Sequence, residues 1–207
     1  PPPPSRYFNR EGRYGEGGAY RDPSSPYRSW YDFDPKYKGG YRSWWGFETL
    51  PEVNEENPSY VEFITGEGGV IDTWLRRGAA GFRLDVADEL PDDFIEKIRA
   101  AVKRVSPEKF LLGEVWEDAT TKYGFGQRRT YLLGKGLDSV MNYPFKNAVL
   151  DFVKGKPAEQ AMGEILSICE HYPAPAMDTA LNFLSTHDTE RALTVIADEP
   201  ANGRGRE

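Results

Sequence analysis

Short, mainly apolar runs alternate along the chain with segments that carry the hydrophobic period of a helix. The apolar runs are residues 81–85, 110–112, 137–143 and 180–186. The segments that repeat apolar residues on one helical face are residues 59–77, 91–106, 145–154 and 157–171. A chain in which strands and helices take turns predicts an α/β fold with a parallel sheet.

Glycine and proline indicate where the helical segments begin and end. Gly66 begins a glycine cluster that interrupts the first segment, and Gly78 predicts its end before the first strand. Pro91 opens the second segment and Pro107 closes it. These residues therefore predict separate helices of ordinary length.

Residues 1–40 differ from the rest of the chain. They are rich in Pro, Gly, Tyr, Arg and Ser and have no sustained apolar period, so we expect irregular structure there. For the first dozen residues a disordered tail is an equal alternative.

Acidic residues stand at the ends of three predicted strands. Asp85 ends the first, Glu114 follows the second, and His187-Asp188 follow the fourth. Each carboxylate taken alone could simply cap the next helix. Because barrel enzymes build their sites from the carboxyl ends of several strands, the combination favours a functional site. The spacing between Asp85 and Glu114 fits one strand, one helix and two loops, which predicts adjacent strands.

The order Asp, Glu, His-Asp at three strand ends resembles the α-amylase clan of retaining glycoside hydrolases. Residues 41–47, leading to 50–54, and residues 141–145 are similar to segments of its neopullulanase, cyclomaltodextrinase and maltogenic amylase branch. The resemblance implies a partial (β/α)8 TIM barrel, about strands four to seven, preceded by the end of an irregular inserted domain B. The implied boundaries are 1–55 for the end of domain B and linker, and 56–207 for the partial catalytic barrel, truncated before strand eight.

The clan's first signature, an Asp with a downstream Asn-His pair, has no counterpart here, because the histidines are His171 and His187. A TIM barrel takes about 250 residues, more than the 207 of this chain. We therefore expect a fragment of an active enzyme, itself inactive in isolation.

The resemblance assigns roles to the three strand ends. It implies Asp85 as nucleophile, Glu114 as general acid and base, and Asp188 as a third carboxylate that binds sugar hydroxyls. Retaining hydrolysis needs the first two carboxyl groups about 5 to 5.5 Å apart. The implied activity is hydrolysis of α-1,4 and also α-1,6 bonds in maltodextrin, cyclodextrin or pullulan. A glucanotransferase of the same clan and an inactive barrel fragment or binding module remain as alternatives.

Neighbouring residues would support this chemistry. Arg83 lies two residues before Asp85, on the same face of the strand, where a guanidinium would keep the nucleophile ionised. Glu114 must hold a proton near neutral pH, which walls of Trp116 and Phe82 would favour. His187 resembles a hydrogen-bond donor to the transition state, and a buried core imidazole is its alternative.

Aromatic residues make up 14% of the chain and gather before residue 61, which suits a glucan groove. Trp44 and Trp45, with Tyr41 and Phe47, would stack on sugar rings. Packing of domain B against the barrel is an equally good explanation, because large aromatic residues dominate contacts between layers.

The net charge limits the kinds of partner that the protein can bind. A net charge of −7 and a pI near 5.1 argue against nucleic acid and against an anionic membrane surface. The basic residues of 127–129 form too short a run to be more than a solvated patch. The expected partner is an α-glucan, and the resemblance allows a homodimer of the parent protein.

The single cysteine, Cys169, fits a reducing compartment. Together with the resemblance, it leads us to expect a cytoplasmic protein. No Cys/His cluster has the spacing of a zinc site, so we expect no metal and no cofactor.

Overall fold

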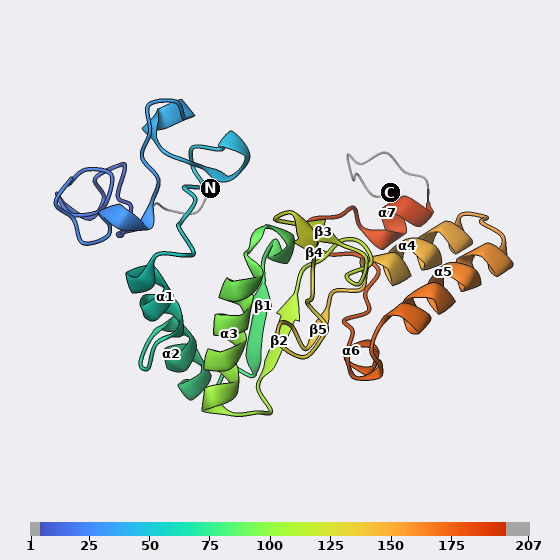
Figure 1. The fold of residues 1–207 in the computed structure, drawn as a ribbon. Helices are drawn as coiled ribbons and strands as arrows, with labels where there is room; N and C mark the ends of the chain where they lie inside the picture. Colours follow the sequence, from blue (N-terminus) through green and yellow to red (C-terminus); the bar gives the residue numbers. More distant parts are fainter. Residues whose placement is uncertain (1–4, 198–207) are drawn as a thin grey trace. The chain divides into compact units, whose positions relative to one another are not determined.

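The computed structural model describes residues 5–197. The chain divides into two compact units, Pro1–Ile71 and Asp72–Glu207, called the first and second unit below (Figure 1). Within the described residues no helix is long enough to cross a bilayer. The longest, α3 (Asp92–Val105) and α5 (Ala158–His171), have 14 residues each, against about 20 for a membrane span.

The first unit is mostly irregular, as predicted. Between residues 5 and 57 the chain forms three single 3-10 turns, η1 (Arg28–Trp30), η2 (Lys38–Gly40) and η3 (Trp44–Gly46), and two isolated β-bridges. Aromatic packing stabilises this unit. Phe8, Ala19 and Tyr41 form its buried core, and further aromatic side chains pack around them. Since Phe8 belongs to this core, the ordered alternative is correct for residues 5–12.

Two short helices follow, where one interrupted helix was predicted. Helix α1 (Pro58–Thr65) starts at Asn57, whose side chain accepts hydrogen bonds from the amides of residues 59 and 60. The glycine cluster then separates it from α2 (Val70–Arg76). Gly78 follows with φ +106°, a conformation that favours glycine, and so confirms the predicted stop.

The second unit contains a parallel sheet with the strand order β1-β2-β5. Strands β1 (Gly81–Leu84) and β2 (Phe110–Gly113) pair along their whole length, from Gly81 with Phe110 to Leu84 with Gly113. Helix α3 connects them and packs against β2 (Figure 1). The predicted alternation of strand and helix is confirmed for this part.

Of the last two predicted strands, one is shorter than predicted and the other does not form. Only Ser139–Val140 forms β5 within 137–143, because Asn142 caps helix α4 (Tyr143–Val153) and ends the extended backbone. The predicted strand at 180–186 is wrong: a single bridge joins Leu181 to Met141. Beyond Leu181 the contacts with this neighbour are made by side chains, between Asn182 and Asn142 and between Phe183 and Tyr143, because the neighbouring chain has already turned into α4.

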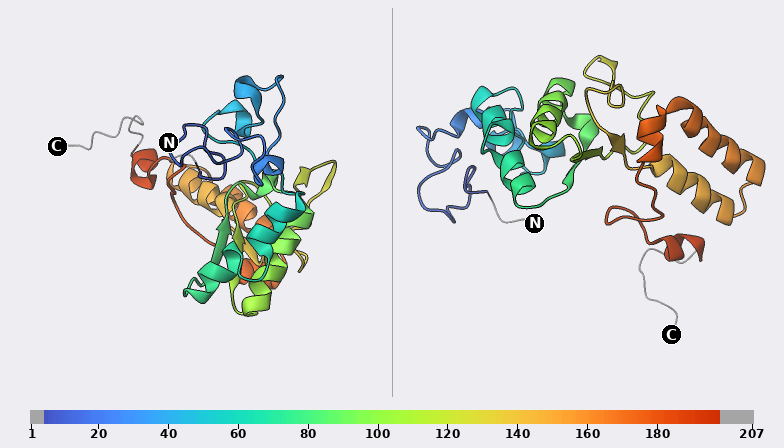
Figure 2. Two further views of the ribbon diagram at one scale, coloured as in Figure 1. Left: turned by 90° about the vertical axis from the view of Figure 1, so that its left-hand side faces the viewer. Right: turned by 90° about the horizontal axis from the view of Figure 1, so that it is seen from below.

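Helices α4 and α5 lie side by side, as Figure 1 and the right-hand view of Figure 2 show. Two short helices, α6 (Ala174–Asp178) and α7 (Ala192–Ile196), were not predicted. The segment between β2 and β5 contains an unpredicted antiparallel hairpin, β3 (Tyr123–Gly124) and β4 (Gln127–Arg128). A 3-10 turn, η4 (Ala87–Glu89), follows β1.

Candidate active site

The pairing of β1 with β2 brings Asp85 and Glu114 together. Leu84 and Gly113 are the last register pair, so the next residue on each strand carries a carboxylate at the same edge. The amide of Glu114 donates to the carbonyl of Leu84 over 3.0 Å and continues the ladder. The prediction of adjacent strands is confirmed.

One guanidinium lies between three carboxylates. Arg83 Nη1 contacts Asp85 Oδ1, and Arg83 Nη2 lies 3.1 Å from Glu114 Oε2 and 3.9 Å from Asp188 Oδ2. These residues come from β1, from the end of β2, and from the segment after the Leu181 bridge. The structure therefore gathers three of the predicted site residues around a fourth, Arg83.

Glu114 and Asp85 have opposite surroundings. Glu114 is 5% exposed, and the Asp85 side chain is 75% exposed. The buried carboxylate accepts a hydrogen bond on each oxygen, from Trp116 Nε1 to Oε1 (2.9 Å) and from the Val86 amide to Oε2 (2.7 Å). Asp85 is thus open to an incoming molecule, whereas Glu114 is held in place.

The predicted wall around Glu114 needs one correction. Successive side chains of a strand point to opposite faces, so Phe82 lies on the face of β1 that Arg83 does not occupy. Because Arg83 contacts Glu114, Phe82 cannot wall it. Trp116 does contact it, as a hydrogen-bond donor.

His187 and Asp188 lie at the exposed side of the group. His187 Nε2 lies 3.2 Å from Asp188 Oδ2, and the imidazole is exposed. A buried core imidazole, the alternative for His187, is therefore wrong. Asp188 joins the two catalytic candidates only through Arg83.

Val86 contributes a backbone group that sequence reasoning missed. Its φ of +45° is left-handed, a conformation that a β-branched residue rarely adopts. This turn directs the Val86 amide to Glu114 Oε2 and the Ala87 amide to the Glu114 carbonyl. No sequence signal could have indicated it, because valine normally argues against such a turn.

Tyr143 also lies at this site. It is buried and stacks on Trp116 with ring centroids 4.4 Å apart. Among the residues that the structure describes, its hydroxyl makes no hydrogen bond of normal geometry. Burial raises the pKa of Tyr143; the neighbouring Thr186 side chain and the charge of Arg83 oppose this rise, and the charges of Glu114 and Asp188 add to it. Its place at the end of the 137–143 run was a signal that could have found it.

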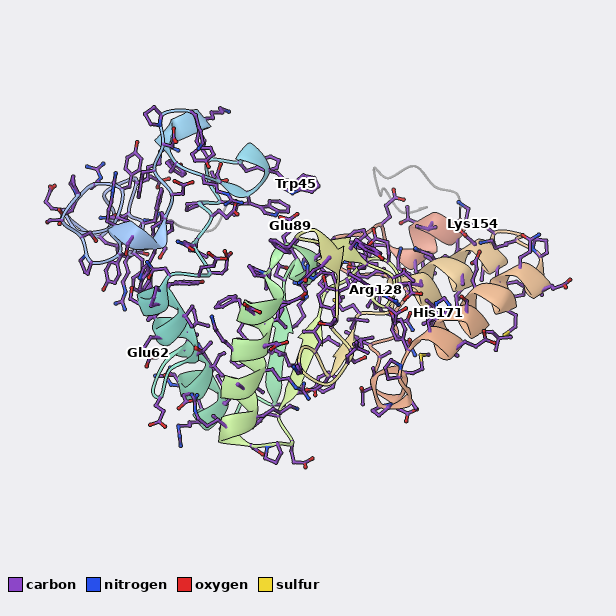
Figure 3. The ribbon with its side chains drawn as sticks, in the orientation of Figure 1. Trp45, Glu62, Glu89, Arg128, Lys154 and His171 are labelled. Carbon is purple, nitrogen blue, oxygen red and sulfur yellow. The ribbon has the colours of Figure 1, made fainter. Side chains whose placement is uncertain are left out.

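The two remaining predicted residues, Trp44 and Trp45, belong to the first unit. Their rings stack with centroids 5.2 Å apart, and Trp45, labelled in Figure 3, is exposed. Tyr41, grouped with them in the predicted groove, is instead buried in the core of that unit beside Phe8. The substrate role of the tryptophan pair stays a prediction.

The basic run at 127–129 is not a solvated patch throughout. Arg129 is 3% exposed and donates to Asp92 Oδ1 and to two backbone carbonyls. In residues 5–197 no group of three or more His, Cys, Asp or Glu side chains has an arrangement that would hold a metal ion.

Comparison with known proteins shows to which family the chain belongs. The family model of the α-amylase catalytic domain matches residues 7–205. Amylopullulanase of Thermoanaerobacterium saccharolyticum is 34% identical over 229 residues, which cover 96% of this chain and 17% of that protein. A cyclomaltodextrinase of Bacillus sp is 37% identical over 155 residues, which cover 72% of this chain and 25% of that protein.

A solved structure agrees with these relatives. The ligand-free cyclic α-maltosyl-(1→6)-maltose hydrolase of Arthrobacter globiformis aligns with a TM-score of 0.76 and 26% identity, over 87% of this chain and 40% of that one. The chain thus spans less than half the length of each of these three proteins. It belongs to the α-amylase catalytic-domain family of glycoside hydrolases and has the TIM-barrel-type fold of that family.

Proposed function

We propose that the protein carrying this chain is a retaining α-glucan hydrolase. Its substrates would be maltodextrin, cyclodextrin or pullulan, cleaved at α-1,4 and also α-1,6 bonds. The names of the relatives, amylopullulanase and cyclomaltodextrinase, support this substrate class. The single observation that carries the proposal is the contact of Arg83 with three carboxylates from three segments.

In the first step, an oxygen of Asp85 attacks the anomeric carbon of the sugar. The bond from that carbon to the glycosidic oxygen breaks, and Glu114 gives its proton to the leaving oxygen. The exposure of Asp85 supports its role as the attacking group. The product is an ester between the sugar and Asp85, with Glu114 left ionised.

In the second step, water attacks the same carbon and releases Asp85. Glu114 now accepts the proton of the water, so the enzyme returns to its starting state. The hydrogen bonds from Val86 and Trp116 orient Glu114, and they suit its ionised state between the two steps.

The other site residues would act on charge and position. Arg83 would orient Asp85, while Asp188 and His187 would bind hydroxyl groups of the distorted ring. Trp116, partly exposed beside Glu114, offers a ring face to the sugar on the leaving side. Trp44 and Trp45 would stack on sugar rings of the glucan.

Transfer to an acceptor sugar is the second candidate activity. The observation that favours it is the exposed ring of Trp116 next to Glu114, held in place by stacking on the buried Tyr143, an apolar surface on which a sugar could replace water. Chromatography of the products from maltotriose would decide: oligosaccharides longer than the substrate indicate transfer, and glucose and maltose without longer products indicate hydrolysis.

The finer architecture is also proposed. We assign β1, β2, β5 and the Leu181 bridge to strands four to seven of the barrel, and residues 1–55 to the end of domain B and its linker. The parallel order β1-β2-β5 supports the numbering, because successive barrel strands are neighbours. A cytoplasmic location and a homodimer of the whole protein stay predictions from the resemblance.

A fluorinated maltosyl fluoride tests the nucleophile directly. Attack by Asp85 expels fluoride and leaves a slowly hydrolysed ester, which intact mass and peptide mapping detect. We expect the adduct on Asp85 in the whole protein, none in Asp85→Asn, and an unchanged adduct in Glu89→Gln, which alters an exposed carboxylate of the same segment. An adduct on another residue, or none in the whole protein, would refute the proposal.

A further inference from the structure

The hairpin β3–β4 has an unusual turn. Tyr123 pairs with Arg128, and Gly124 pairs with Gln127, so Phe125 and Gly126 form a two-residue connection. Both have positive φ, +51° and +77°, as in a type I′ turn. The first position of such a turn favours Asn, Asp or Gly, and an aromatic side chain there is strained.

The strained residue is also exposed. Phe125 is 63% exposed, and Tyr123, two residues earlier, is 75% exposed. An exposed aromatic ring gains little from folding, so neither strain nor exposure of Phe125 is explained by stability of the hairpin. Strain that persists in this way is typical of binding and catalytic segments.

The hairpin is firmly attached to both catalytic strands. The segment that leads to it begins with Glu114, the residue after β2, and reaches β3 at Tyr123. At its other end, the buried Arg129 bonds the segment that follows Asp85, through Asp92 Oδ1 (2.9 Å) and the carbonyls of Asp88 and Leu90 (2.7 and 2.6 Å). The hairpin is thereby held at the edge of the sheet that carries the site (Figures 1 and 3).

We propose that Tyr123 and Phe125 bind a stretch of α-glucan beyond the bond that is cleaved. The identity of the ligand rests on the proposed function. Aromatic rings offer broad apolar faces with little loss of side-chain freedom, and these faces fit the apolar faces of glucose rings. The two rings would therefore strengthen binding of long chains and leave short ones unaffected.

A purely structural role for Phe125 makes a different prediction. The Arg129 guanidinium lies 5.2 Å from the centre of the Phe125 ring, so the ring could serve to cover that cation. In that case loss of the ring would lower stability. If the ring serves ligand binding, Phe125→Asn should keep or raise the melting temperature, because Asn tolerates positive φ.

Calorimetric titration of the chain with maltotriose and with a long maltodextrin tests the proposal. We expect the long glucan to bind more tightly, and Phe125→Asn or Tyr123→Ser to weaken its binding by about 3- to 10-fold. Maltotriose binding should not change. Phe125→Trp, which keeps a ring, and Phe152→Asn, which removes an exposed ring from α4, should bind like the unchanged chain.

Equal affinity of the unchanged chain for both glucans would overturn the inference. So would unchanged binding in Phe125→Asn, or in Tyr123→Ser, which leaves the strained turn intact and decides the case if Phe125→Asn unfolds. The labelling of Asp85 judges the proposed function separately. Loss of long-glucan binding in the hairpin variants without any Asp85 adduct would support the aromatic site and refute the retaining mechanism.

Discussion

Replacement of Arg129 by leucine should destabilise the second unit more than any surface change. The guanidinium is 3% exposed and reaches three acceptors: Asp92 Oδ1 and the carbonyls of Asp88 and Leu90. Leucine has similar bulk near the backbone but no donor. The substitution therefore leaves a carboxylate and two carbonyl groups without their partner.

The expected loss follows from these contacts. Removal of one partner of a buried ion pair costs about 3 to 5 kcal/mol, because the other charge stays buried. The lower end applies here, because Asp92 also lies in the first turn of α3, where the helix dipole favours a negative charge. For a chain of this size a loss of about 3 kcal/mol lowers the melting temperature by about 6 to 12 °C.

Arg128→Leu is the matched control. Arg128, labelled in Figure 3, precedes Arg129 and is exposed, and its side chain donates a hydrogen bond from Nε to the carbonyl of Thr120. Its loss should cost no more than about 1 kcal/mol. Thermal unfolding followed by circular dichroism at neutral pH compares both variants with the unchanged chain. Equal shifts for the two variants would refute the assignment of Arg129 as a buried clamp.

Three other expectations concern stability. Burial disfavours the ionised form of Asp138, but hydrogen bonds from Lys103, Arg99 and the Leu111 amide outweigh it and lower the pKa of Asp138. The stabilisation that ionised Asp138 gives to the folded state is therefore complete above the unfolded pKa of about 3.9 and is lost as pH falls through the lower folded pKa. Urea titrations should show Asp138→Asn less stable than the unchanged chain by about 1 to 2 kcal/mol at pH 7, and by less below pH 4. A stability difference that is the same at both pH values would contradict this. Gly81→Ala should cost about 1 to 3 kcal/mol, because the new Cβ would overlap with the Phe110 carbonyl, whereas Gly163→Ala, in the open on α5, should stabilise slightly; the two melting temperatures provide the check. Asn57→Ala should cost about 1 kcal/mol, since it removes the acceptor for two amides at the start of α1, and an unchanged melting temperature would show that α1 needs no cap.

Sequence reasoning succeeded where a local signal had one structural outcome. Gly78 could end a helix because glycine alone adopts its φ at no cost, and Pro91 could start one because its missing amide is not needed there. The paired positions of Asp85 and Glu114 followed from two strands of equal length joined by one helix. These features depend on neighbours in the chain, and the sequence contains them.

Prediction from the sequence failed where the local structure depends on partners that are distant in the chain. Arg129 has the same sequence surroundings as Arg128, yet its burial depends on Asp92 and on carbonyls that lie some 40 positions earlier. The run at 180–186 has the composition of a strand, but pairing needs an extended neighbour, and Asn142 ends that neighbour after Met141. Val86 contradicts its own propensity because its amide bonds Glu114.

Charge is balanced differently at the two edges of the sheet. At the edge where β5 begins, the single carboxylate of Asp138 lies between two cations, Arg99 and Lys103. This cluster has no excess of negative charge, as suits ion pairs with a purely structural role. At the opposite edge Arg83 is one cation beside two carboxylates, Asp85 and Asp188, and beside Glu114, which holds a proton at the start of the proposed mechanism. Such an excess of negative charge is costly in a folded protein unless a positive charge arrives, and in the proposed mechanism the oxocarbenium-like sugar brings it. The same excess that would weaken the fold would therefore stabilise the transition state.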